Sequence, residues 1–195
     1  YSLPIIEDDA YGRLVRTAPA AFASLAPSLT YYVTGLSKTV GAGLRIAYVH
    51  APGQRPMQRL AGALRALTVM ASPLTTAIAT RWIDDGTAAR LVEAIRDESA
   101  QRLQLAARLL TAHPLRAHPE GFHVWLPLPA GFDANVLAAW LRERGVPAVA
   151  AAAFSTDAQP PDALRVNLGG PGTRAQCAAG LQLVVEALAR PPSRS

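Results

Sequence analysis

Short apolar runs separated by turn residues mark the beginning of the chain. Residues 3 to 6, 30 to 34 and 45 to 50 are rich in β-branched and aromatic side chains, and each run has the length of a strand. Glycine and proline residues such as Gly12 and Pro27 lie between the runs and are typical of turns. These patterns predict three strands joined by loops.

Helical patterns follow the third strand. Residues 54 to 70 and 73 to 84 predict two helices, and Gly86 is a typical stop after the second. Residues 87 to 112 then carry apolar side chains at roughly helical spacing, which predicts one long helix. Pro114 ends it, because proline cannot continue the helical hydrogen bonding.

After the long helix, short strand-like and helix-like segments alternate. This compact alternation is typical of an α/β unit smaller than the first part of the chain. We expect strands at residues 122 to 128, 146 to 150 and 163 to 168, and helices at residues 133 to 144 and 173 to 189.

The composition is that of a globular protein. Half of the 195 residues are apolar, which is enough for one large or two small cores. No apolar run is long enough to span a bilayer, and no signal-peptide pattern opens the chain, so we expect a cytoplasmic protein. The net charge of +5 comes from arginines scattered along the predicted helices, which does not indicate a nucleic-acid interface in this chain.

The single cysteine, Cys177, cannot form an internal disulfide. It lies in register with Leu181, Val184 and Leu188 on a helical apolar stripe, which predicts a buried structural thiol. No spacing of cysteine and histidine resembles a metal site, so we expect no metal.

One lysine, Lys38, stands among nineteen basic residues, and all the others are arginine. Arginine keeps its proton in proteins, whereas a lysine amine can lose its proton and form an imine with an aldehyde. Lys38 is therefore a candidate covalent residue. The alternative is that an Ala- and Arg-rich composition left one lysine by chance.

The neighbours of Lys38 favour a ligand site. Residues 34 to 45 form a strand end, a glycine-bearing loop and an arginine, Arg45, that opens the next strand. Residues 7 to 12 place carboxylates and a tyrosine at the end of another strand. In α/β folds, ligands bind where strands end in loops. Arg165 lies within an otherwise apolar strand, where its charge must either find an anion or incur a large cost of burial.

These segments resemble the pyridoxal-phosphate enzymes of aminotransferase fold type I. The resemblance rests on EDDAYG at 7–12, SK at 37–38, GLR at 43–45 and LRVNLGG at 164–170. It implies an α/β fold: the C-terminal half of such a domain, with part of the large mixed-sheet domain and the small α/β C-terminal domain. It also implies pyridoxal 5′-phosphate as the cofactor.

The resemblance assigns a role to each matching residue. Lys38 would form the imine with the cofactor aldehyde, and Ser37 and Arg45 would hold the phosphate. Asp8 would keep the pyridine nitrogen protonated, and Tyr11 would donate to the phenolic oxygen of the ring. A forked guanidinium suits a phosphate dianion, and a carboxylate suits a protonated ring nitrogen.

Further positions extend or depart from this pattern. Arg165 matches the arginine that binds the α-carboxylate of the substrate, and Asp9 is expected to be structural. Gly35 stands where the family often has a serine or threonine for the phosphate, so that contact is missing or comes from Thr34.

The family's phosphate-binding helix, ring-stacking residue and ring-binding asparagine would all lie before residue 1. We therefore expect a fragment of a longer protein, and weak cofactor binding by this chain alone. The resemblance divides the chain into residues 1 to 86 of the large cofactor-binding domain, a connecting helix at 87 to 113 and a small domain at 114 to 190.

Within this fold, residues 84–102, 121–129 and 163–176 look most like MocR-type regulators, as does the V-x-A-x-x-F pattern at 149–154. Such regulators join a GntR-type winged helix-turn-helix to an aminotransferase-like effector domain. The resemblance implies sensing of an amino acid or amine by transimination at Lys38, a homodimer, and DNA binding only through an N-terminal domain outside this chain.

The alternative is a free-standing class I/II aminotransferase that moves an amino group from an amino acid to a 2-oxo acid. A third alternative, an inactive scaffold, is disfavoured by the full set of cofactor residues.

Overall fold

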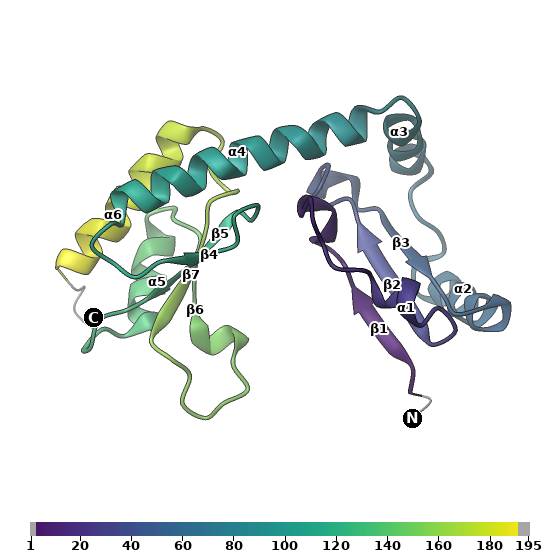
Figure 1. Ribbon diagram of the computed structural model, residues 1–195, viewed down its shortest axis with the longest axis horizontal. Coiled ribbons are helices and arrows are strands. Elements are labelled where there is room, and N and C mark those ends of the chain that lie inside the picture. The colour runs from purple at the N-terminus through teal and green to yellow at the C-terminus, as the bar shows by residue number, and fades with distance from the viewer. Residues whose placement is uncertain (1–2, 191–195) are drawn as a thin grey trace. The chain divides into compact units, whose positions relative to one another are not determined.

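The computed structural model describes residues 3–190 and divides into two compact units. Unit 1 is Tyr1–Ile95 and unit 2 is Arg96–Ser195. The division falls inside the longest helix, α4 (Thr87–Leu109), in the segment predicted as a connecting helix (Figure 1). No helix among residues 3–190 is long and apolar enough to cross a membrane.

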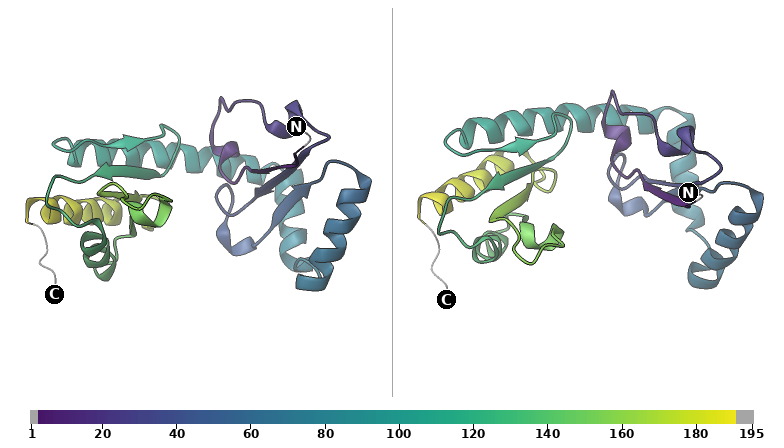
Figure 2. Two further views of the ribbon diagram at one scale, coloured as in Figure 1. Left: turned by 90° about the horizontal axis from the view of Figure 1, so that it is seen from below. Right: turned by 60° about the horizontal axis from the view of Figure 1, so that its bottom comes forward.

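Unit 1 is built on a three-stranded sheet in the order β1-β2-β3. The first two strands pair in parallel and the last two pair antiparallel. The helix α2 lies next to the sheet on the side of β3 (Figures 1 and 2). The strands are β1 (Ile5–Asp8), β2 (Thr30–Gly35) and β3 (Ala47–His50), and the helices are α1 (Phe22–Leu25), α2 (Gln54–Thr68) and α3 (Pro73–Asp84), with 3-10 turns η1 (Gly12–Leu14) and η2 (Ala42–Leu44).

Unit 1 buries little apolar surface. Its core cluster consists of Leu36, Ile46 and Ala79, with Val40 and Leu44 packed against it. The helix α2 contributes no buried residue. The site described below therefore lies beside a small core.

Unit 2 contains a four-stranded antiparallel sheet in the order β4-β5-β7-β6. Alternate residues of β5 and β7, such as Val124, Leu126 and Leu164, are buried in one large core. The elements are β4 (Arg116–Ala117), β5 (His123–Pro127), α5 (Ala134–Glu143), β6 (Ala148–Ala150), the 3-10 turn η3 (Ala151–Phe154), β7 (Ala163–Asn167) and α6 (Arg174–Ala189).

Local chemistry explains where the helices of unit 2 begin. The Asp133 carboxylate accepts hydrogen bonds from the backbone N–H groups at the start of α5. Thr173 and Gln176 form a reciprocal capping box at the start of α6. Both motifs satisfy N–H groups that a helix leaves unpaired. In α6, Cys177, Leu181, Val184 and Leu188 are all buried, which confirms the predicted buried thiol.

The ends of two helices follow from glycine. Gly86 has φ of 76° directly after α3, and Gly145 has φ of 77° after α5. Glycine adopts this left-handed backbone without the steric cost that a side chain adds. The predicted stop at Gly86 is therefore confirmed.

Candidate functional site

The loop that carries Lys38 is fastened at its base between β2 and β3. The Leu36 backbone N–H donates to Ile46 O at 3.1 Å, and both side chains are buried. The Leu36 carbonyl accepts from the N–H groups of Val40 and Gly41, each at 2.9 Å. The loop therefore has a fixed foundation, and its exposed turn presents Lys38.

Neighbouring side chains of this loop point to different environments. Thr39 is buried and its hydroxyl donates to Gly35 O at 3.3 Å, whereas Lys38 is exposed. A long charged side chain keeps its amine in water, while a short hydroxyl can be satisfied internally. Thr39 therefore stabilises the loop, while the Lys38 amine stays accessible to a ligand.

A cavity of about 210 Å³ opens where the ends of β1 and β2 meet the lysine loop and the start of β3. Four of the residues predicted from the sequence line it together: Asp8, Ser37, Lys38 and Arg45. The fifth, Tyr11, places its ring centroid 5.8 Å from Lys38 Nζ. This volume is below the roughly 300–1,000 Å³ of typical ligand pockets.

The two adjacent aspartates have different surroundings. Asp9 Oδ2 accepts a hydrogen bond from the Tyr32 hydroxyl at 2.5 Å, and a side chain at position 12 would collide with the Asp9 carboxylate. Burial raises the pKa of Tyr32, and the hydrogen bond to Asp9 raises it further. Asp9 is thus engaged in local structure, while Asp8 lines the Lys38 cavity.

Arg45 has an unusual backbone. Its φ of 53° and ψ of 35° place it in the left-handed region, directly after η2. A residue with a Cβ pays roughly 1–2 kcal/mol for this conformation. The strand predicted from residue 45 therefore begins at Ala47, because Arg45 turns the chain before it enters β3.

Gly35 stands where the family often has a serine or threonine that binds the phosphate, and Thr34 precedes it. Thr34 lines the cavity, and its hydroxyl donates to Asp9 O at 3.1 Å. A hydroxyl has one proton to donate, so in this arrangement Thr34 can only accept from a ligand. At Gly35, an added Cβ would meet Ile46 O at 3.5 Å, which is ordinary van der Waals contact.

The groups around the cavity fit pyridoxal phosphate chemically. Within residues 3–95, the side chains of Asp8, Lys38 and Arg45 form no hydrogen bond or ion pair with one another or with other side chains. The cavity therefore offers an amine for the aldehyde and a carboxylate for the ring nitrogen. It also offers a guanidinium and a hydroxyl for the phosphate.

Arg165 lies in unit 2, a different compact body from the Lys38 cavity. It is the middle residue of β7, paired with Trp125 on β5 and Val149 on β6. Its guanidinium stacks on the Phe154 ring, with the guanidinium carbon 4.3 Å from the ring centroid. Sequence reasoning identified the arginine but not this stacking.

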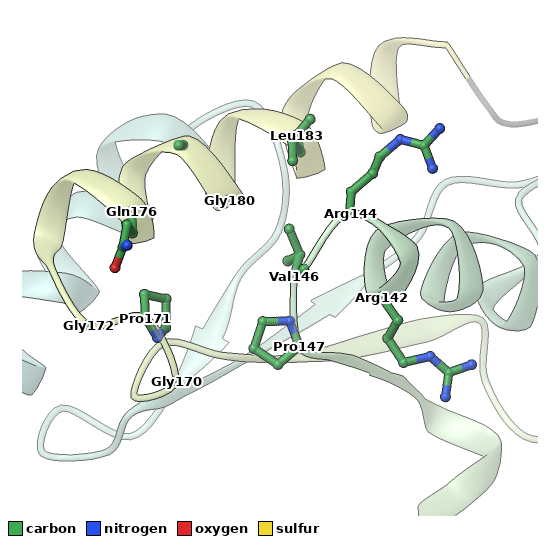
Figure 3. Close-up of a pocket in the computed structure, with 12 residues that line it drawn as sticks. Arg142, Arg144, Val146, Pro147, Gly170, Pro171, Gly172, Gln176, Gly180 and Leu183 are labelled. Atoms are coloured by element: carbon green, nitrogen blue, oxygen red, sulfur yellow. The ribbon is translucent and has the colours of Figure 1, made fainter.

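A second and larger cavity of about 680 Å³ lies in unit 2 between α6, the end of α5 and the turn that precedes α6 (Figure 3). Its two arginines are Arg142 and Arg144, and both guanidinium groups extend away from Pro171 and Gln176. They donate to carbonyl groups of α5, and Arg144 also stacks over Trp140 at 3.9 Å. Both arginines thus bind backbone carbonyl groups of α5, and no nucleophilic side chain lines the cavity.

The curated relatives of the chain are regulators. It is 32% identical over 188 residues to the uncharacterized HTH-type transcriptional regulator YdeF of Bacillus subtilis (strain 168), covering 94% of this chain and 40% of YdeF. The chain is homologous to HTH-type transcriptional regulators. YdfD of the same organism, also named as an HTH-type regulator, is 27% identical over 152 residues, which cover 74% of this chain and 31% of YdfD. The chain thus spans well under half the length of these regulators.

Solved structures that resemble the chain include aminotransferases. Kynurenine aminotransferase of Pyrococcus horikoshii has a TM-score of 0.83 at 19% identity, over 100% of this chain and 50% of its own. LysN, the α-aminoadipate aminotransferase of Thermus thermophilus, complexed with N-(5′-phosphopyridoxyl)-L-leucine, has a TM-score of 0.80 at 24% identity, over 96% and 50%. No protein-family model matches the chain.

Together these findings confirm the predicted resemblance and the predicted fold. The chain has an α/β fold that corresponds to about half of an aminotransferase chain. The roles of the individual site residues stay predictions. Among residues 3–190, no group of histidine, cysteine, aspartate and glutamate side chains could hold a metal ion.

Proposed function

We propose that this chain is part of the effector domain of an HTH-type transcriptional regulator, and that the intact protein senses an amino acid or amine through pyridoxal 5′-phosphate bound at Lys38. The observation that carries the proposal is the cavity that Lys38 shares with Asp8, Ser37 and Arg45. The similarity of the chain to YdeF, which is named as an HTH-type transcriptional regulator, supports the regulatory part of the proposal.

Each residue of the cavity has a distinct task in this proposal. When bound, the cofactor supplies an aldehyde that can exchange amines and a ring that withdraws electrons. Lys38 Nζ would hold the cofactor covalently and would be displaced by the amino group of the ligand. Asp8 would accept a hydrogen bond from the protonated ring nitrogen, and Tyr11 would donate its hydroxyl to the phenolic oxygen. Arg45 and Ser37 would donate to the phosphate.

The released Lys38 amine then determines the outcome. In a sensor, it stays displaced while the ligand remains attached, and the changed occupancy of the site alters the conformation of the protein. In an enzyme, it would carry a proton from the ligand Cα, which is the general-base step of amino-group transfer. The same atom serves both functions, so only turnover separates them.

Arg165 supplies recognition of the ligand. Its guanidinium can bind a carboxylate through two parallel hydrogen bonds, which fixes orientation as well as charge. We propose that it binds the α-carboxylate of an amino-acid ligand. We also propose that the intact protein binds DNA through a helix-turn-helix outside this chain, as the names of its relatives suggest. The family resemblance further implies a homodimer, which we include in the proposal.

Reduction by borohydride followed by peptide mapping of the intact protein tests the covalent residue. We expect cofactor label on the Lys38 peptide, and this region offers no second lysine to confuse the assignment. The matched control is Lys38→Arg, which keeps the positive charge but cannot form an imine. Label on another residue, or undiminished label in the arginine variant, would overturn the assignment.

Titration of the intact protein with L-amino acids and a 2-oxo acid then separates sensor from enzyme. A sensor gives a stable change in the absorbance of the cofactor with no new 2-oxo acid. Continuous production of the new 2-oxo acid would instead support the second candidate, a class I/II aminotransferase. That candidate is favoured by the fold, because the similar solved structures are aminotransferases.

A further inference from the structure

The strand β7 separates two environments on its two faces. Leu164 and Val166 point into the core of unit 2, where they are 0% and 2% exposed. Arg165 lies between them and belongs to the opposite face, where it is half-buried. On that face its cross-strand neighbours are Trp125 and Val149. A guanidinium is therefore set on a largely apolar surface.

Phe154 stacks on this guanidinium from outside the strands. The ring lies 4.3 Å from the guanidinium carbon, and Trp125 packs edge-on against Phe154 with 6.4 Å between ring centroids. Phe154 ends the 3-10 turn η3, whose first residue, Ala151, is buried. The turn thus anchors one end in the core and presents an aromatic ring at the other.

Phe154 contributes little to the core itself. It is 48% exposed and is absent from the apolar cluster of unit 2. A half-exposed aromatic ring in contact with a cation gains mainly from the attraction between the cation and the ring face. Its position is therefore better explained by Arg165 than by packing.

The guanidinium itself is incompletely paired. Arg165 Nε is buried and has no hydrogen-bond partner. Within unit 2, no carboxylate among the described residues forms an ion pair with Arg165. A buried donor without a partner destabilises the folded protein, and a charged donor does so more strongly. Stacking engages a face of the guanidinium and uses none of its N–H groups, which lie in the plane of the group.

From this arrangement we infer that Phe154 is a positioning residue for carboxylate recognition: its ring holds the Arg165 guanidinium in the orientation in which it binds the ligand carboxylate. The inference rests on the proposed function, because that proposal supplies the carboxylate. Stacking restricts the rotamers of a long side chain before the ligand arrives, so less entropy is lost on binding. Phe154 acts through Arg165 and does not touch the reacting atoms.

The test compares amino acids with amines that lack only the carboxylate. Intact, cofactor-loaded protein is titrated with L-alanine against ethylamine, L-leucine against isoamylamine, and L-phenylalanine against 2-phenylethylamine. The ratio of the two affinities in each pair measures carboxylate preference. We expect Phe154→Leu to lower this ratio about three- to tenfold, the range of a partly exposed cation–π contact. Phe154→Tyr keeps the aromatic face and should retain the wild-type ratio.

Two further variants separate the inference from the proposed function. Arg165→Ala should abolish the preference, and adding Phe154→Leu to it should change nothing more. If Arg165→Ala leaves the preference intact, or if the wild type prefers no carboxylate in any pair, the carboxylate role of Arg165 fails and the inference with it. If Arg165→Ala abolishes the preference but Phe154→Leu does not lower it, only the inference fails.

A second readout does not need the cofactor. Phenylglyoxal modifies accessible arginines, and mass spectrometry of the apoprotein follows its reaction at Arg165. Release from the ring should speed this reaction several-fold in Phe154→Leu but not in Phe154→Tyr. Thermal unfolding should be nearly unchanged in both variants, since the ring is half exposed. Equal rates in all three proteins would contradict a positioning role.

Discussion

The two units of the chain differ sharply in how they bury apolar side chains. Unit 2 gathers nineteen buried residues into one cluster, whereas the cluster of unit 1 has three. Of the thirteen large apolar side chains that are exposed among the described residues, twelve belong to unit 1 and one, Phe154, to unit 2. Unit 2 thus carries its own core, while unit 1 leaves many large apolar side chains exposed.

This difference in burial bears on cofactor binding, because the Lys38 cavity lies in unit 1, which has the smaller core. Its walls come from strand ends and one loop, and the small cluster around Leu36 and Ile46 fixes them. The similar aminotransferase structures have about twice the length of this chain. We therefore expect full cofactor affinity only where further protein covers unit 1, whereas unit 2 should keep its packing by itself.

Two leucine truncations, one in each unit, test the difference in burial most directly. Leu126 is 0% exposed in unit 2 and Leu67 is 82% exposed in unit 1. Leu126→Ala should lower the free energy of unfolding by about 3 kcal/mol, since it leaves a cavity in a dense core. Leu67→Ala should change it by less than about 0.5 kcal/mol. Urea denaturation of each variant measures both, and equal losses would refute the contrast.

A buried polar cluster also contributes to unit 2. Arg102 on α4 is 7% exposed and donates to Leu168 O at 2.6 Å and to Pro171 O at 2.8 Å. Arg102→Ala would leave both carbonyl groups without this partner, so we expect a loss of about 2 kcal/mol. The control is Arg108→Ala, an exposed position on the same helix, which should be nearly neutral. A similar loss in both variants would count against the cluster.

The stability of unit 2 should also depend on pH through Glu98. Hydrogen bonds from Arg174 and then Arg102 lower the pKa of Glu98 from 4.5 to about 2. A lowered folded-state pKa means that the contribution is complete above pH 4.5 and disappears as the pH falls toward 2.

Because Glu98 is about one-third exposed, solvent screening limits the effect to about 1 kcal/mol. The measurement is the difference in unfolding free energy between wild type and Glu98→Gln as the pH falls from neutral toward the lowered pKa. A constant difference across this whole range would contradict the assignment.

The smallest expected effect is a gain at the cavity of unit 1. Gly35→Ser would place a hydroxyl where the family often has one for the phosphate, and the backbone leaves room for the Cβ. One added hydrogen bond should raise the affinity of the intact protein for pyridoxal phosphate a few-fold. Gly62→Ser, in open space on α2, is the matched control. Unchanged or weaker binding at Gly35→Ser would argue against a phosphate at that position.

The sequence predicted elements that are long enough to show a period. The helices α2 to α6 and the strands β5 and β7 lie within a few residues of their expected bounds. The two-residue strand β4 and the four-residue helix α1 were missed, because such short segments contain no repeat. Segments distant in sequence stabilise them. The strand β4 pairs with β5, and α1 packs beside β2, with the Glu7 carboxylate accepting hydrogen bonds from the N–H groups of Phe22 and Ala23.

The candidate site was predictable for a different reason. Asp8, Lys38 and Arg45 all stand next to strand ends, and strands that pair in one sheet bring such ends together. The contact between Phe154 and Arg165 depends instead on the shape of η3 and on the pairing of β6 with β7. No local pattern encodes that geometry, so a ring that meets a guanidinium across a loop escaped prediction.

Arg45 has a left-handed backbone, which is unfavourable for a residue with a side chain. The position therefore lowers the stability of the fold while it supplies a guanidinium to the cavity. Glycine would relieve the strain and asparagine would tolerate it, so either would suit the fold at least as well as arginine does. A protein optimised only for folding would therefore have no reason to keep a guanidinium there. Glycine or asparagine variants at Arg45 would therefore remove the guanidinium that we propose for the phosphate while leaving the melting temperature unchanged or higher.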